Sequence, residues 1–216
     1  MRLVSLRVGV TVSDVVFSPF KNDRDRVAAG RLGMWLFLIS LGMVFGASIF
    51  AYIVVRMQLV GEDDWWPEDA PGLPVLLLVS TGFLLLGSVA LALANRSAAN
   101  GATGRTVGLW MVSTCVLLVA FLAMQTVAWV DLAQNNLAFG DSLYAWMFYV
   151  LTGLHAVHVL AGLPPAFVTT VNAFRGRYTE VDASRSGLTY CGMYWHFLDG
   201  VWIVLYIVLL WGMRPG

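Results

Sequence analysis

The stretch LGMWLFLISLGMVFGASIFAYIVV, residues Leu32–Val55, contains no Asp, Glu, Lys or Arg. About 20 apolar helical residues cross a hydrocarbon core of roughly 30 Å, because a helix satisfies its backbone hydrogen-bonding groups internally. This stretch is long enough to cross a bilayer once and too short to cross it twice. It therefore predicts a transmembrane helix at residues 32–55.

Four further stretches have the same character, and Asp199 is the only charged residue within them. They extend over Ala70–Asn95, Thr106–Val130, Ser142–Phe174 and Ser186–Met213. We expect spans at about 73–94, 106–130, 143–172 and 187–212, because each stretch is again one bilayer long. The chain is thus predicted to be an all-α, five-helix membrane bundle over residues 32–213, preceded by an arm of residues 1–31.

The composition excludes several classes of protein. Only 12% of the residues are charged and 59% are hydrophobic, whereas a soluble domain carries about 25% charged residues. The 13 basic and 13 acidic residues balance, so the basic field that nucleic-acid binding needs is missing. Cys115 and Cys191 cannot make a disulfide scaffold, and we interpret both as small buried hydrophobes.

Positive charges predict the orientation, because Lys and Arg in short loops prefer the cytoplasmic side. Of the 13 Lys and Arg residues, all but Arg56 and Arg214 precede the first span or lie in the loops after the second and fourth. We therefore expect the N-terminus inside and the C-terminus outside. Residues 1–31 lack the apolar block of a signal peptide. They are expected to form a cytoplasmic arm that either lies against a neighbouring protein or is a free tail.

The loop GEDDWWPEDAPG, residues Gly61–Gly72, falls on the outer side and is acidic. Its Trp65 and Trp66 are typical of the membrane–water interface, where aromatic rings are enriched. A solvated loop is the simpler interpretation, and docking of a basic soluble partner is the alternative.

Polar side chains within the spans are few, and an ionisable one costs at least roughly 2.5–3.5 kcal/mol at the centre of a bilayer. His155 and His158 lie in the fourth span, His196 and Asp199 in the fifth, and the neutral Gln125 in the third. The members of each pair are three residues apart and so share a helix face. The two pairs lie at similar depths, so adjacent antiparallel helices could bring them together.

Three interpretations of these residues remain open. A haem or metal site would need His196 with His155 or His158, because two ligands from one helix side cannot take opposite faces of a haem. A proton relay through His196 and Asp199 is the second interpretation. In the third, which we favour, these groups satisfy one another and fix the register of the helices. A transporter is disfavoured because five spans cannot be halved into inverted repeats.

Small residues and prolines indicate how the helices pack. Gly42 and Gly46 form a G-x-x-x-G pattern, and Gly192 and Gly200 share a stripe with His196. Such residues let helix backbones approach closely. The pair Pro164–Pro165 removes two amide donors and is expected to kink or loosen the fourth helix. No motif for covalent chemistry is found, so we expect no catalytic residue.

Two of the predicted helices resemble a known family. The segments FYVLTGLHAVHVLAG (Phe148–Gly162) and YWHFLDGVWIVLYIVLLW (Tyr194–Trp211) resemble the signature segments of subunit III of haem-copper respiratory oxidases, the cytochrome c oxidase subunit 3 family. The segment Gly30–Ile53 is similar to that family's opening conserved helix, and FLAMQTVAWVDL (121–132) is similar more loosely. The resemblance extends over residues 30–212.

The resemblance implies the short, five-helix bacterial form of this subunit, in a bacterial inner membrane. Such a chain packs against subunit I, which carries haem and copper and reduces oxygen to water, within a complex that also contains subunit II and translocates protons. It binds no haem, copper or other metal itself and associates with phospholipid. Arg175 and Arg177 match the position of lipid head groups. The remaining motif residues would be structural: His155, His158, Trp195, His196 and Asp199.

The sequence departs from the family at two positions. Members usually carry a carboxylate directly after a serine in the first of these helices, where Ser40 is here followed by Leu41. Many place another Glu next to the position of Trp129, where this chain has Ala128. A carboxylate-dependent proton role is therefore in doubt. The third subunits of quinol oxidases and the accessory proteins of nitric-oxide reductases belong to the same superfamily, so the electron donor and the oxidant stay open.

Overall fold

The computed structural model describes residues 23–58, 65, 72, 75–135, 137–178 and 186–213. These residues form the helices α1 (Asp23–Gln58), α2 (Val75–Ala99), α3 (Gly104–Gln134), α4 (Leu143–Phe174) and α5 (Ser186–Gly212). All five are long and apolar enough to cross a membrane. No strand occurs within the described ranges. The predicted all-α architecture with five membrane-spanning helices is confirmed.

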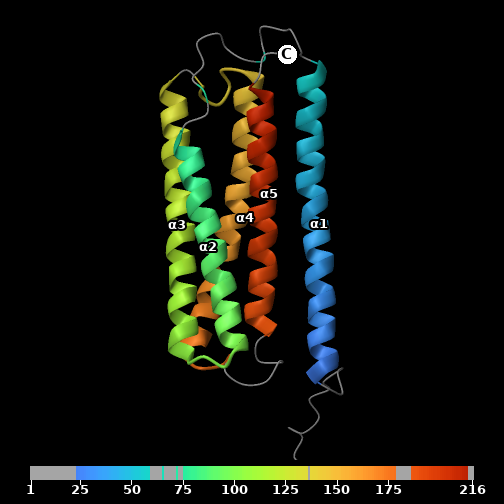
Figure 1. Ribbon diagram of the computed structural model, residues 1–216. Coiled ribbons are helices and arrows are strands. Elements are labelled where there is room, and N and C mark those ends of the chain that lie inside the picture. Colours follow the sequence, from blue (N-terminus) through green and yellow to red (C-terminus); the bar gives the residue numbers. More distant parts are fainter. Residues whose placement is uncertain are drawn as a thin grey trace, which may run out of the picture.

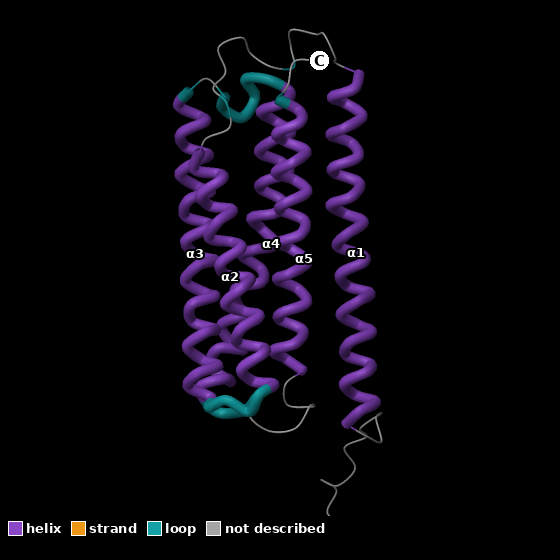
Figure 2. Tube along the Cα trace, in the orientation of Figure 1, coloured by secondary structure: helices purple, strands orange, loops and turns teal. Residues whose placement is uncertain are grey.

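The helices α2 to α5 form a four-helix group, and α1 lies outside it against α5 (Figure 1). Around the group α2 contacts α3, α3 contacts α4, α4 contacts α5, and α5 returns to α2, while α1 also touches α4. Short loops connect α2 to α3 and α3 to α4 (Figure 2). Because successive helices alternate in direction, α1, α3 and α5 all begin at the same end of the bundle.

Local signals set several helix ends. The Thr103 hydroxyl accepts a hydrogen bond from the Thr106 amide at the start of α3, and the Ser142 hydroxyl accepts one from the Ala145 amide at the start of α4. Such side chains replace the partners that the first amides of a helix lack. After α4, Gly176 has a φ of 71°, a left-handed conformation that favours glycine and stops the helix.

The helices extend beyond the charge-free stretches. The first begins at Asp23 instead of near residue 32, so the last part of the expected arm is helical, while residues 1–22 lie outside the described residues. Acidic residues stabilise a helix N-terminus, and Asp25 lies in the first turn of α1. A charge-free stretch measures the apolar part of a helix, whereas polar residues continue the same helix past that part.

The proline pair does not interrupt α4. The helix runs from Leu143 to Phe174 with Pro164 and Pro165 inside it. The Thr169 hydroxyl donates to the Pro165 carbonyl over 2.7 Å, and the Thr170 hydroxyl donates to the Ala166 carbonyl over 2.8 Å. Threonine hydroxyls thus supply donors in the turn that follows the pair.

The small-residue patterns behave differently from the expectation. A Cβ on Gly42 would touch Phe197 at an ordinary 3.7 Å, and a Cβ on Gly46 or Gly200 would meet nothing within 4 Å. A Cβ atom on Gly192 would lie 3.0 Å from the side-chain amide nitrogen of Asn95. Within this chain, therefore, only Gly192 of these four glycines is needed for a close approach.

Trp65, which lies between α1 and α2 in the sequence, packs onto the bundle. Its side chain is buried, and its indole nitrogen donates to the Gly212 carbonyl over 2.9 Å. Tyr52 and Tyr144 contact the ring edge-on, and the Arg56 guanidinium lies 5.2 Å from the ring centre. The acidic residues of this loop lie outside the described residues, so docking of a basic partner there stays a prediction.

Candidate functional site

His155 lies in the interior, where α4 meets α1, α3 and α5. Its side chain is fully buried. The ring centre lies 4.9 Å from that of Trp202, 5.9 Å from that of Phe121 and 6.3 Å from that of Phe45. Neither ring nitrogen has a hydrogen-bond partner. His155 is therefore packed as an aromatic side chain would be, enclosed by rings from three other helices.

His158, one turn further along α4, is satisfied by its own helix. Its Nδ1 atom donates to the Leu154 carbonyl over 2.7 Å, and its ring lies 5.2 Å from that of Phe45. Its own carbonyl accepts a 2.7 Å hydrogen bond from the Tyr194 hydroxyl of α5. This position thus joins α4 to α5 through the backbone.

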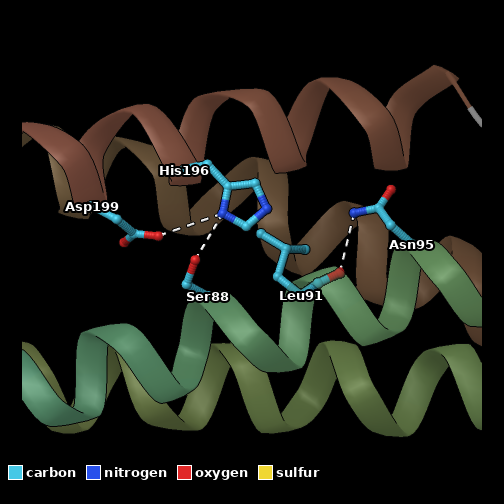
Figure 3. A network of polar contacts seen from close by, with 5 residues as sticks. All are labelled: Ser88, Leu91, Asn95, His196 and Asp199. Atoms are coloured by element: carbon cyan, nitrogen blue, oxygen red, sulfur yellow. Dashed lines mark hydrogen bonds and ion pairs between the residues drawn. The ribbon is translucent and has the colours of Figure 1, made fainter.

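His196 and Asp199 lie together on α5, as the spacing predicts (Figure 3). The distance from His196 Nδ1 to Asp199 Oδ2 is 3.7 Å, and the two side chains are 46% and 8% exposed. The same Nδ1 atom lies 2.7 Å from the Ser88 hydroxyl of α2. Asp199 Oδ2 has no hydrogen-bond partner, so Ser88, and not the carboxylate, makes the short contact with the ring.

Ser88 and Thr81 are the residues that the sequence analysis missed. Ser48, Ser113 and Thr126 donate to the carbonyl four residues earlier in their own helices, which is the ordinary behaviour of hydroxyls in helices. Ser88 instead contacts α5, and Thr81 Oγ1 accepts a 2.9 Å hydrogen bond from the Trp202 indole. Serine and threonine are too common in these helices for either residue to give a sequence signal.

The two polar pairs are not joined. Among the described residues no hydrogen bond or ion pair links His155 or His158 with His196 or Asp199. The fourth helix directs His155 toward aromatic rings, whereas His196 faces α2. The described residues also contain no group of three or more His, Cys, Asp or Glu side chains that could hold a metal ion.

Trp195 and Gln125 complete the buried polar set. The Trp195 ring packs against the backbone of Gly162 in α4. A Cβ atom on Gly162 would lie 2.8 Å from the indole of Trp195 and 2.6 Å from the ring of Tyr194, so only glycine leaves room for both rings. The Trp195 indole nitrogen and both amide atoms of Gln125 have no hydrogen-bond partner. The structure thus assigns Trp195 a packing role between α4 and α5.

A cleft of about 480 Å³ lies between α1, α4 and α5. Phe37, Pro165, Val168 and Trp195 are among the mostly apolar residues that line it. Tyr178 also lines it, directly after Arg177 in the turn that follows α4. Arg175 and Arg177 are exposed in this turn. The cleft therefore has a mostly apolar wall and ends at Tyr178, in the turn that carries the two arginines.

Comparison with known proteins gives consistent matches over most of the chain. The family model described as Cytochrome c oxidase subunit III matches residues 13–213. The cytochrome c oxidase subunit 3 of Corynebacterium diphtheriae is 30% identical over 172 residues, which cover 79% of this chain and 82% of that protein. The cytochrome bo(3) ubiquinol oxidase subunit 3 of Pseudomonas aeruginosa is 32% identical over 178 residues, 82% of each chain. The cytochrome c oxidase subunit 3 of Synechocystis is 30% identical over 178 residues, 82% of this chain and 73% of that protein.

Proposed function

Because the chain belongs to the cytochrome c oxidase subunit III family, we propose that it is a non-redox subunit that stabilises the catalytic subunit of its complex. As a subunit III of a haem-copper oxidase, it is a multi-pass membrane protein that associates with other oxidase subunits. The complex is an oxidoreductase of the respiratory chain. What this chain contributes to that reaction is the subject of the proposal.

One observation carries the proposal: Tyr194, His196 and Trp202 of the second signature segment make bonds between helices. Ser88 contacts the His196 ring, and Trp202 donates to Thr81, so two bonds join α5 to α2. The Tyr194 hydroxyl joins α5 to α4 at the His158 carbonyl. Hydrogen bonds of this kind fix neighbouring helices in a membrane, where the hydrophobic effect does not. The polar groups of the signature segments thus have a structural use within the chain.

Haem and copper would accordingly belong to partner subunits, with haem-copper subunit I and subunit II as the expected neighbours. A haem held by His196 and His155 is disfavoured, because the aromatic rings of Phe45, Phe121 and Trp202 enclose His155. Its insertion would have to displace core side chains from three helices.

Proton transfer by carboxylates at the two family positions is also disfavoured. Leu41 and Ala128 occupy these positions, and both are buried in the core. If the complex translocates protons, we propose that this chain contributes no carboxylate at either place.

The electron donor has two candidates. Two of the relatives are named cytochrome c oxidase subunit 3, and one is named ubiquinol oxidase subunit 3. Their identities to this chain are almost equal. We favour cytochrome c, because the family model carries that description, and keep a quinol as the second candidate.

The distribution of arginines supports an orientation with the N-terminus inside a bacterial inner membrane. Arg24, Arg26 and Arg31 lie in the first part of α1, and Arg96 in the last turn of α2, Arg105 at the start of α3 and the arginines that follow α4 lie at the same end. Arg56 lies near the opposite end of α1. Positive residues prefer the cytoplasmic side, so the arginine-rich end is the expected cytoplasmic end.

Phospholipid is the proposed occupant of the cleft between α1, α4 and α5. The apolar wall suits acyl chains, and Arg175 and Arg177 suit a phosphate because guanidinium groups bind phosphate oxygens well. Burial raises the pKa of the Tyr178 hydroxyl above its ordinary value of 10. Tyr178 therefore stays protonated at neutral pH, and its buried hydroxyl interacts with Asn172 and Thr169 at this end of the cleft.

Purification of the tagged chain from its native membrane in mild detergent tests the proposed function. We expect a haem-copper subunit to co-purify and the reduced complex to show haem absorption bands. The absence of any haem-copper subunit from the companions of the chain would contradict the proposal. The haem types and the reaction with cytochrome c or a quinol then decide between the two donors.

A further inference from the structure

His196 presents a polar ring at a depth where lipid offers no partner. The helix α5 has 27 residues, so at about 1.5 Å per residue it is roughly 39 Å long. His196 lies about 15 Å from its first residue, which places the ring roughly 10 Å inside a core of roughly 30 Å. Nevertheless 46% of its side chain is exposed on the outside of the chain. The side chain of histidine is too short to reach the membrane surface from that depth, unlike those of Lys and Arg.

One ring nitrogen of His196 has no partner among the described residues. Both contacts of the ring, with Ser88 and with Asp199, are made by Nδ1, and Figure 3 shows the other nitrogen on the far side of the ring from these groups. Intramembrane ionisable groups almost always face a protein interior or another polar group, so Nε2 requires a partner beyond the described helices.

The contact with Ser88 leaves Nε2 as the free polar atom of the ring. The Ser88 hydroxyl lies 2.7 Å from Nδ1, and which of the two atoms donates depends on the tautomer of the ring. Nε2 donates in one neutral tautomer and accepts in the other. In either tautomer the missing partner of Nε2 is a polar group.

The surface beside His196 leaves room for a helix to approach. Gly200 lies one turn further along the same stripe of α5 and is exposed, and a Cβ there would meet nothing within 4 Å. Ile203 of α5 and Leu85 of α2 are exposed hydrophobic residues of these two helices. Small residues allow close packing between transmembrane helices, and the glycine that is not needed inside this chain is available for an external contact.

We propose that the α2–α5 face centred on His196 and Gly200 binds a transmembrane helix of a partner oxidase subunit, which places a polar group at His196 Nε2. This inference rests on the proposed function, because it requires a companion subunit. A second copy of the chain fits less well, since a two-fold contact at this face would bring two equivalent Nε2 atoms toward each other. Lipid acyl chains offer no polar group at this depth.

Photocrosslinking in the native complex tests the proposal. Gly200 is replaced by a benzophenone-bearing phenylalanine analogue, and the control carries the same analogue at Val116, which is 61% exposed on α3. The helix α3 packs mainly against α2 and α4, so the exposed Val116 samples a different face. We expect a covalent product with a partner oxidase subunit from position 200 and at least several-fold less from position 116.

Two further variants separate a polar contact from mere proximity. His196→Leu is expected to lower the yield of the crosslink from position 200 several-fold, and His196→Gln, which retains a donor, to restore part of it. Crosslinks from position 200 to lipid alone or to a second copy would overturn the inference, as would a yield that His196→Leu leaves unchanged. Haem absorption of the same preparations reports independently on the proposed function. A complex with haem but without the crosslink contradicts only the inference about this face.

Discussion

At the scale of single residues, the family histidines differ in what they contact. His155 is enclosed by aromatic rings, His158 is bonded to its own helix, and His196 reaches across to Ser88. The sequence could show that these residues are unusual in a membrane span, and it could place His196 next to Asp199. It could not show that Ser88 supplies the short contact, because the direction of a serine hydroxyl depends on the neighbouring helix.

Ser88→Ala tests the bond between α2 and α5. Hydrogen bonds between membrane helices contribute on average about 0.6 kcal/mol and at most about 1.7 kcal/mol, so we expect a loss of stability in this range. Ser48→Ala is the matched control, because the Ser48 hydroxyl donates only to the Val44 carbonyl of its own helix. Unfolding of both variants by denaturing detergent measures the difference. Equal stability of the two would show that the Ser88 contact contributes nothing.

Gly162→Ala tests the packing of α4 on α5. The new methyl group would lie 2.6 Å from Tyr194 and 2.8 Å from Trp195, and overpacking of this kind costs about 1–3 kcal/mol. Gly153→Ala on the same helix is the control, since a Cβ there meets nothing within 4 Å. We therefore expect a lower melting temperature for Gly162→Ala than for Gly153→Ala in thermal unfolding. Equal melting temperatures would contradict this packing.

At the scale of elements, the sequence predicted the existence and order of the five helices because the absence of charge over one bilayer length is a strong constraint. It predicted their ends poorly. The first helix begins at Asp23, and α3 continues to Gln134, because polar residues cost nothing in a helix that has left the apolar core. The helix α4 continues through Pro164 and Pro165, and the kink expected there stays a prediction.

Packing between elements was the least predictable part. The pattern Gly42–Gly46 suggested a close helix contact, yet Gly162 and Gly108 are the glycines against which Trp195 and Phe174 pack closely. Spacing identifies a helix face but not which neighbour covers it. The cleft beside Tyr178 likewise depends on the relative positions of α1, α4 and α5, which no single segment encodes.

The orientation of the elements can be tested at the two ends of α3. Asn100 and Gln134 are exposed and flank this helix, so we prepare Asn100→Cys and Gln134→Cys in a background with Cys115→Ala and Cys191→Ala. A membrane-impermeant maleimide added to spheroplasts, which lack an outer membrane, should label the variant at position 134 and should reach position 100 only after lysis. The reverse pattern would contradict the proposed orientation.

At the scale of the whole molecule, the chain is one membrane unit with surfaces available to lipid and to other subunits. Its exposed hydrophobic residues include Leu36 and Phe50 on α1 and Leu78 and Leu86 on α2, as expected for helices that meet apolar surroundings. The cleft between α1, α4 and α5 is the feature that fits a bound phospholipid.

Ala161→Phe is expected to reduce the lipid held by the complex, because Ala161 lines the cleft and a phenylalanine ring would fill part of it. Val157→Phe is the control, since Val157 lies one turn earlier on α4, is 60% exposed and does not line the cleft. Native mass spectrometry of the purified complex counts the retained phospholipids. An unchanged count for Ala161→Phe would contradict lipid binding in the cleft.

The central claim is that polar side chains of the second signature segment join helices of this chain and that the chain carries no redox centre. The most direct measurement is the absorption spectrum and metal content of the chain after its separation from all other subunits, with its helical content checked by circular dichroism. We expect a helical protein with neither a Soret band nor stoichiometric iron or copper. A Soret band in the separated chain that disappears in His196→Ala would contradict the claim.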